Sequence, residues 1–111
     1  MHSQIYVAGR LISNPEIGLT KKGKPWVKLL IETELVRADG RSGAYQVEQI
    51  ILPINCFSQE AEAVKDLCRG DPVVAGCHLY GTRFETQVGE VKHGVQLIAD
   101  TVYRHQGREG S

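Results

Sequence analysis

Apolar and polar residues alternate along most of this chain, and this two-residue period constrains its fold more than any other feature. Side chains two residues apart on a β-strand point to the same face, so alternation is typical of strands with one buried face. In residues 5–11 the predicted inner face carries Ile5, Val7, Gly9 and Leu11. A glycine inside such a strand indicates a bend or bulge, as at the corner of a barrel.

The same alternation predicts four more strands, at residues 26–36, 45–54, 73–84 and 91–103. Segments rich in glycine, proline, asparagine and aspartate separate the strands and are typical of turns; they cover residues 13–15, 21–25, 37–43 and 87–90. Pro53 has no backbone N–H to donate, so the end of the third strand should lie at a sheet edge or a bulge.

Residues 58–70 are the one segment that predicts a helix. Ser58 is a suitable N-cap, glutamates follow in the first turn, and Gly70 is a suitable stop. One face of this helix would plug the core with Ala61, Val64, Leu67 and Cys68.

The predicted order of elements is therefore β-β-β-α-β-β. This order indicates an all-β OB-fold, a five-stranded Greek-key β-barrel with one α-helix between strands 3 and 4. A doubly wound α/β fold is excluded because helices do not alternate with strands. An SH3-like barrel is the main rival, and the position of the helix favours the OB-fold. We expect one domain over residues 1–104 and a disordered tail over residues 105–111, which has no apolar anchor.

The charge of the chain does not by itself indicate a polyanionic partner, because 13 basic residues balance 13 acidic ones. The distribution is uneven, since residues 1–30 hold five lysines or arginines and only one acidic residue, Glu16. No apolar run approaches the roughly 20 residues that span a membrane, and the N-terminus lacks a secretory signal pattern. We therefore expect a cytoplasmic protein without a membrane partner.

Catalytic and metal-binding patterns are missing from the sequence. Cys56, Cys68 and Cys77 are odd in number, which does not suit a disulfide framework, and none forms a Cys-x2-4-Cys zinc pair. No Gly-x-Ser-x-Gly elbow or Gly-x-x-x-x-Gly-Lys-Ser/Thr phosphate loop occurs. We expect no enzyme activity, no metal site and no cofactor.

Several short motifs resemble the bacterial single-stranded DNA-binding protein (SSB) family over residues 4–103. In chain order they are Gly9-x-Leu11, Asn14-Pro15-Glu16, Gly23-Lys24-Pro25 leading into 27–31, the run 52–57, and the run 67–73 after the helix. Each motif is short, but their order and spacing together are specific. The primosomal protein N (PriB) branch of the same family is similar in length and in its last strand.

The resemblance implies an OB-fold that binds single-stranded DNA without strong sequence preference, in DNA replication, recombination or repair. It also implies a homo-oligomer, a tetramer as in typical SSB proteins or a dimer as in PriB. A PriB-like primosome protein with a helicase or another replication protein as partner is the first alternative. An OB-fold protein-interaction module without nucleic-acid binding is the second. The acidic tail of typical SSB proteins does not occur, so the chain is either a tail-less branch or one whose tail was removed.

Binding a single strand needs aromatic rings that stack on bases and cations that follow the phosphates. The resemblance assigns base stacking to Phe57 and to Phe84. The positions of two other stacking tryptophans of the family fall near Arg37 and Ile51, and an arginine can still stack on a base. Plain core packing is the alternative for both phenylalanines.

Other candidates come from the residues themselves. Trp26 shares a predicted strand face with Lys28, so it is either a stacking platform or a subunit contact. Further rings and cations in the predicted turns and strands would extend the groove; they are Lys21, Lys22, Lys24, Arg41, Tyr45, Tyr80, Arg83 and Lys92. The lysine run is also typical of a plain solvated turn.

Overall fold

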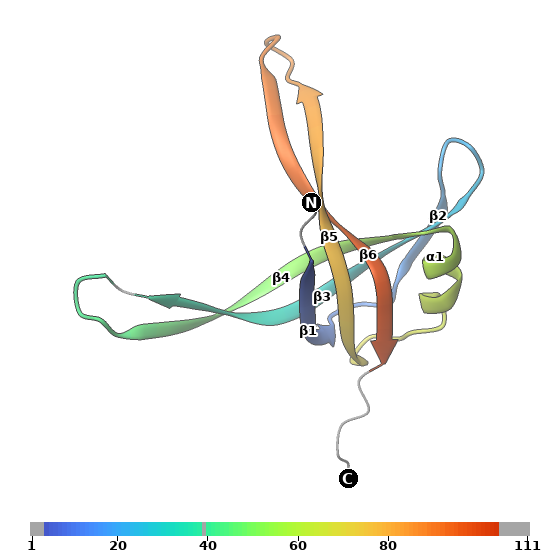
Figure 1. Ribbon diagram of the computed structural model, residues 1–111. Coiled ribbons are helices and arrows are strands. Elements are labelled where there is room, and N and C mark those ends of the chain that lie inside the picture. Colours follow the sequence, from blue (N-terminus) through green and yellow to red (C-terminus); the bar gives the residue numbers. More distant parts are fainter. Residues whose placement is uncertain (1–3, 39, 105–111) are drawn as a thin grey trace.

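Six strands and one short helix make up the computed structural model, which describes residues 4–38 and 40–104 (Figure 1). In chain order the elements are β1 (Ile5–Leu11), β2 (Glu16–Leu19), β3 (Pro25–Ala38), β4 (Tyr45–Phe57), α1 (Ser58–Val64), β5 (Pro72–Glu85) and β6 (Val91–Arg104). The predicted tail over residues 105–111 lies outside the described residues.

The strands are hydrogen-bonded in the order β1-β5-β6-β4-β3-β2, and β1 also pairs with β3. That second pairing joins Arg10 to Glu32 and Leu11 to Ile31, and it closes five strands into a barrel. All pairings are antiparallel except that of β4 with β6. A closed five-stranded barrel with one helix between β4 and β5 confirms the predicted OB-fold.

The core lies inside the barrel and is built from every second residue of each strand. α1 adds Ala61 and Val64 to this core, as predicted; Leu67 follows the helix and is only partly buried against the core, and the prediction was wrong for Cys68, which is exposed. The buried strand residues are Val7, Leu11, Val27, Leu29, Ile31, Ile54, Cys56, Val73, Ala75, Cys77 and Ala99. Their side chains leave the alternate residues of each strand on the outer face.

The barrel closes where β1 passes very near β3 at Gly9. A Cβ atom built on Gly9 would overlap the carbonyl oxygen of Glu32 and would lie 2.8 Å from Cγ2 of Ile31. The glycine predicted at a barrel corner is therefore required by a close approach of two backbones.

The helix prediction was right in position and wrong at both ends. α1 ends at Val64 rather than at Gly70, and its N-cap position is Phe57, with no side-chain cap. Ser58 lies inside the element with a φ of 53°. After α1 the chain forms a loop rather than further helix. The Asp71 side chain stabilises this loop, because its Oδ2 accepts a hydrogen bond from the Cys68 N–H at 2.8 Å.

The short strand β2 was missing from the sequence prediction. It pairs with β3 from Glu16 opposite Lys28 to Leu19 opposite Pro25. Four residues that include Gly18 are too few for a period of two to be recognised. Beyond the barrel, β3–β4 and β5–β6 continue as two long hairpin arms that project in different directions (Figure 1).

Replacing Gly9 with alanine tests the closure of the barrel. The added Cβ has no space beside Glu32, so Gly9→Ala should lower the free energy of unfolding by about 1–3 kcal/mol or more. Gly81→Ala is the matched control in β5, because no heavy atom lies within 4 Å of a Cβ built there. Urea unfolding followed by circular dichroism measures both, and equal stability of the two variants would contradict the closure.

Two of the three cysteine thiols belong to the core. Cys56 and Cys77 are buried, whereas Cys68 is exposed. Burial raises the pKa of Cys56 to about 12 and that of Cys77 to about 11. Both core thiols are therefore protonated and unreactive at neutral pH.

These raised pKa values predict a loss of stability at alkaline pH. Above pH 9, the ordinary pKa of the thiol, an unfolded chain releases the thiol protons while the folded barrel keeps them, so rising pH favours unfolding. Each thiol should remove about 1.4 kcal/mol per pH unit, from pH 9 up to its folded pKa. Urea unfolding between pH 8 and about 11 measures the slope. Cys56→Ala should flatten it, and an unchanged slope in that variant would refute the assignment.

Candidate nucleic-acid interface

Strand register arranges the outer face of the barrel in rows, because paired residues on neighbouring strands share a face. One row, here called the ring row, contains Gly18, Trp26 and Phe57 from β2, β3 and β4. The next row, here called the polar row, crosses five strands from β2 to β5; in order across the sheet its residues are Glu16, Lys28, Asn55, Ile98 and His78. Two predicted rings and a predicted lysine thus lie on one surface.

Trp26 is held from two sides at the centre of the ring row. Its indole Nε1 donates a hydrogen bond to Oδ1 of Asn55 at 3.1 Å. On β2, a Cβ built on Gly18 would lie 3.0 Å from Cε3 of Trp26, so the missing side chain leaves space for the indole. Phe57 is half-buried beside Trp26, which leaves part of both rings in solvent.

Lys28 is the cation next to these rings, and it has a carboxylate neighbour. Its Nζ lies 3.7 Å from Oε1 of Glu16, and the Glu16 side chain is 61% exposed. A surface ion pair of this kind contributes little stability, so the lysine can exchange its partner at small cost.

A second group of rings lies on the outer face of the β5–β6 arm. Phe84 is paired with Lys92, and Tyr80 stacks at a tilt against His78 with ring centres 5.7 Å apart. Phe84 is 54% exposed, which excludes the core-packing alternative for this residue. Since His78 and Ile98 belong to the polar row, the outer face continues from Asn55 to this arm.

Other predicted site residues lie away from these rows. Arg83 is one residue from Phe84 on β5 and so points to the opposite face of the arm. Arg37 forms a 3.0 Å ion pair with Glu48 within the β3–β4 arm. The remaining candidates occupy hairpin ends: Lys21, Lys22 and Lys24 in the exposed β2–β3 turn, and Arg41 and Tyr45 at the end of the β3–β4 arm. Figure 1 shows that the hairpin ends point away from one another.

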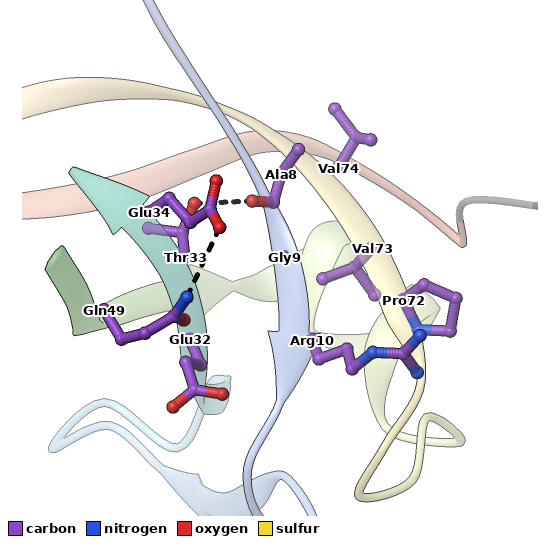
Figure 2. A pocket seen from close by; sticks show the side chains of 10 residues that line it. All are labelled: Ala8, Gly9, Arg10, Glu32, Thr33, Glu34, Gln49, Pro72, Val73 and Val74. Atoms are coloured by element: carbon purple, nitrogen blue, oxygen red, sulfur yellow. Dashed lines mark hydrogen bonds between the residues drawn. The ribbon is translucent and has the colours of Figure 1, made fainter. Parts of the chain in front are cut away.

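The outer face of β3 becomes acidic towards its other end. A pocket with a volume of about 420 Å³ lies there, between β1 and the β3–β4 arm. Its lining includes Arg10, Glu32 and Glu34 (Figure 2). Glu34 accepts a 3.4 Å hydrogen bond from Gln49 in the same pocket. Two carboxylates repel phosphate, so a nucleic-acid strand is favoured at the Trp26 end of the face.

Sequence reasoning missed Asn55 and Glu16 as members of the site. The one available signal was an isolated polar residue between the apolar Ile54 and Cys56, which places Asn55 on the outer face of its strand. Only the register of β3 against β4 shows that it meets Trp26.

Two searches of the described part of the chain returned nothing. Within residues 4–38 and 40–104, no helix is long and apolar enough to cross a membrane. Over the same ranges, no group of three or more His, Cys, Asp or Glu side chains is placed to hold a metal ion.

A closed OB barrel with exposed rings beside cations has the features of a protein that binds single-stranded nucleic acid. Comparison with known families agrees: the model of the single-strand binding protein family matches residues 2–105, and the chain belongs to this family. No curated protein sequence is a significant match.

Solved structures with the same fold include three single-stranded DNA-binding proteins. The wild-type protein from Thermus aquaticus has a TM-score of 0.80 and 23% identity to this chain. The matched region covers 98% of this chain and 52% of the Thermus chain. The Plasmodium falciparum SSB in complex with ssDNA has a TM-score of 0.73 and 16% identity, covering 93% of this chain and 94% of its own. The small protein from Streptomyces coelicolor has a TM-score of 0.69 and 17% identity, covering 97% and 98%. The chain therefore spans about half the length of the Thermus protein.

Proposed function

We propose that this protein binds single-stranded DNA without strong sequence preference, through stacking of bases on Trp26 and Phe57. The observation that supports this most is the ring row, with two partly exposed rings side by side and Lys28 in the adjacent row. Every base has an aromatic face, so stacking binds a strand whatever its sequence. Lys21, Lys22 and Lys24 in the exposed β2–β3 turn stay predictions for further phosphate contacts.

The β5–β6 arm supplies the second contact in this proposal. Phe84, Tyr80 and Lys92 would receive the strand after it crosses the polar row. Because the arms project in different directions, a strand that reaches more than one of them has to wrap around the barrel. Arg37, Arg41, Tyr45 and Arg83 stay predictions for this wrapping path.

Several wider features belong to the same proposal. We propose that the protein works as a homo-oligomer, dimer or tetramer, in DNA replication, recombination or repair in the cytoplasm. A replication protein such as a helicase stays a predicted partner. The family is one of binding proteins by its name, and the lack of catalytic activity stays a prediction.

Binding to oligo-dT tests the proposed function directly. Trp26 is the single tryptophan of the chain, so quenching of its fluorescence reports on the ring row. We expect quenching at low salt that weakens steadily as salt rises, because bound lysines release counterions from the phosphates. Phe57→Ala should weaken binding by about 1–3 kcal/mol.

Tyr103→Ala is the matched ring deletion, because Tyr103 is exposed on β6 and lies outside both rows. Its affinity for oligo-dT should equal that of the wild type. A folded protein that ignores oligo-dT at low salt would refute the proposal and leave the protein-interaction module as the better reading.

Charge at the polar row gives a second prediction. Glu16 opposes phosphates near Lys28, so Glu16→Gln should raise the affinity for oligo-dT at low salt by about twofold to fivefold. Glu62→Gln removes a similar exposed carboxylate on α1, which pairs at 2.8 Å with Lys65 just after the helix, and should change affinity less. Fluorescence titration measures both, and weaker binding by Glu16→Gln would count against Lys28 as a phosphate or base contact.

A further inference from the structure

The hydrogen bond between Trp26 and Asn55 fixes which way the Asn55 amide faces. An indole N–H can only donate, so the atom 3.1 Å from it must be the amide oxygen of Asn55. The amide nitrogen is therefore turned away from Trp26 with two N–H donors. Within residues 4–38 and 40–104, this nitrogen has no hydrogen-bond acceptor in the protein.

The neighbours of Asn55 in the polar row do not satisfy these donors. Lys28 on β3 is itself only a donor, and Ile98 on β6 is apolar. Asn55 and Lys28 therefore both present hydrogen-bond donors to a ligand, and a ligand with acceptor atoms is complementary to them. Glu16, the carboxylate of this row, lies on the far side of Lys28 from Asn55.

The spacing of the two rows suits a single base. Residues two apart on a strand are separated by about 6.6–6.8 Å, which is comparable to the width of a nucleobase. A base stacked on the rings of Trp26 and Phe57 would therefore bring one edge to Asn55 and Lys28. A phosphate is less favoured at this row, because Glu16 lies 3.7 Å from the Lys28 ammonium and repels it.

From this geometry we infer that Asn55 reads the edge of the base that stacks on Trp26, and favours bases with carbonyl oxygens. Thymine offers the carbonyl oxygens O2 and O4, and guanine offers O6 beside N7. Adenine has no carbonyl oxygen, and its N6 amino donor lies beside its acceptors N1 and N7. Asn55 and Lys28 would meet that amino group donor to donor. The inference rests on the proposed function and adds a preference for keto bases at one subsite of an otherwise sequence-tolerant surface.

Asn55→Asp is the variant that tests this inference. An aspartate oxygen still accepts the indole N–H of Trp26, but the outward amide donors are replaced by an acceptor. For the wild type we expect Trp26 quenching at lower concentrations of oligo-dT than of oligo-dA. In Asn55→Asp the ratio of the two affinities should fall by about threefold to tenfold, because a hydrogen bond to the keto base is lost.

Gln96→Glu is the matched control for charge. Gln96 is exposed on the β5–β6 arm opposite Tyr80, and this variant makes the same amide-to-acid change without touching Trp26. It should weaken binding to both oligonucleotides equally and leave their ratio unchanged. A ligand-side measurement avoids any change in the protein: oligo-dT with difluorotoluene in place of thymine keeps the shape but loses the carbonyl acceptors. Wild-type protein should bind it about threefold to tenfold more weakly.

The results separate this inference from the proposed function. An unchanged dT/dA ratio in Asn55→Asp, or equal binding of the difluorotoluene oligonucleotide, would overturn the reading of bases by Asn55 while DNA binding stands. Retention of oligo-dT without quenching of Trp26 would also overturn it. A folded protein that retains no oligonucleotide at low salt would overturn the proposed function as well.

Discussion

The close approach of β1 to β3 at Gly9 is the constraint on which the rest of the structure depends. Because no side chain separates the two backbones there, β1 pairs with β5 along one edge and with β3 along the other. Once five strands are closed in a ring, each has one inward face and one outward face. The core residues fill the inside, and the outer rows take their places from the same registers.

The net charge of this protein is zero, but its charged residues are unevenly distributed over the surface. The outer face of β3 carries Trp26 and Lys28 near the start of the strand and Glu32 and Glu34 further along, beside β1. A neutral chain can therefore present one end of a strand face to a polyanion and keep carboxylates at the other. Rings add a contribution that does not depend on charge, so a modest number of cations is compatible with binding a single strand.

Membership of the single-strand binding protein family and the arrangement of the outer face point in the same direction. The family comparison identifies the fold and the class of protein, whereas the contacts around Trp26 come from the structure of this chain. The indole is fixed by Asn55 on β4 and has space because β2 carries Gly18. A ring held in this way loses little freedom when a base stacks on it, which favours binding.

The sequence by itself determined the fold class, the inward and outward faces, and the partnership of Trp26 with Lys28 on one face, because these follow from a period of two along single strands. It did not reveal β2, the early end of α1, or the separation of Arg83 and Arg37 from the rings. Those features depend on pairing between distant segments and on local contacts such as the hydrogen bond that the Asp71 side chain accepts from the Cys68 N–H in the turn after α1. Only the tertiary structure placed Asn55 against Trp26 and Glu16 against Lys28, because register across strands is set by the closure of the whole barrel.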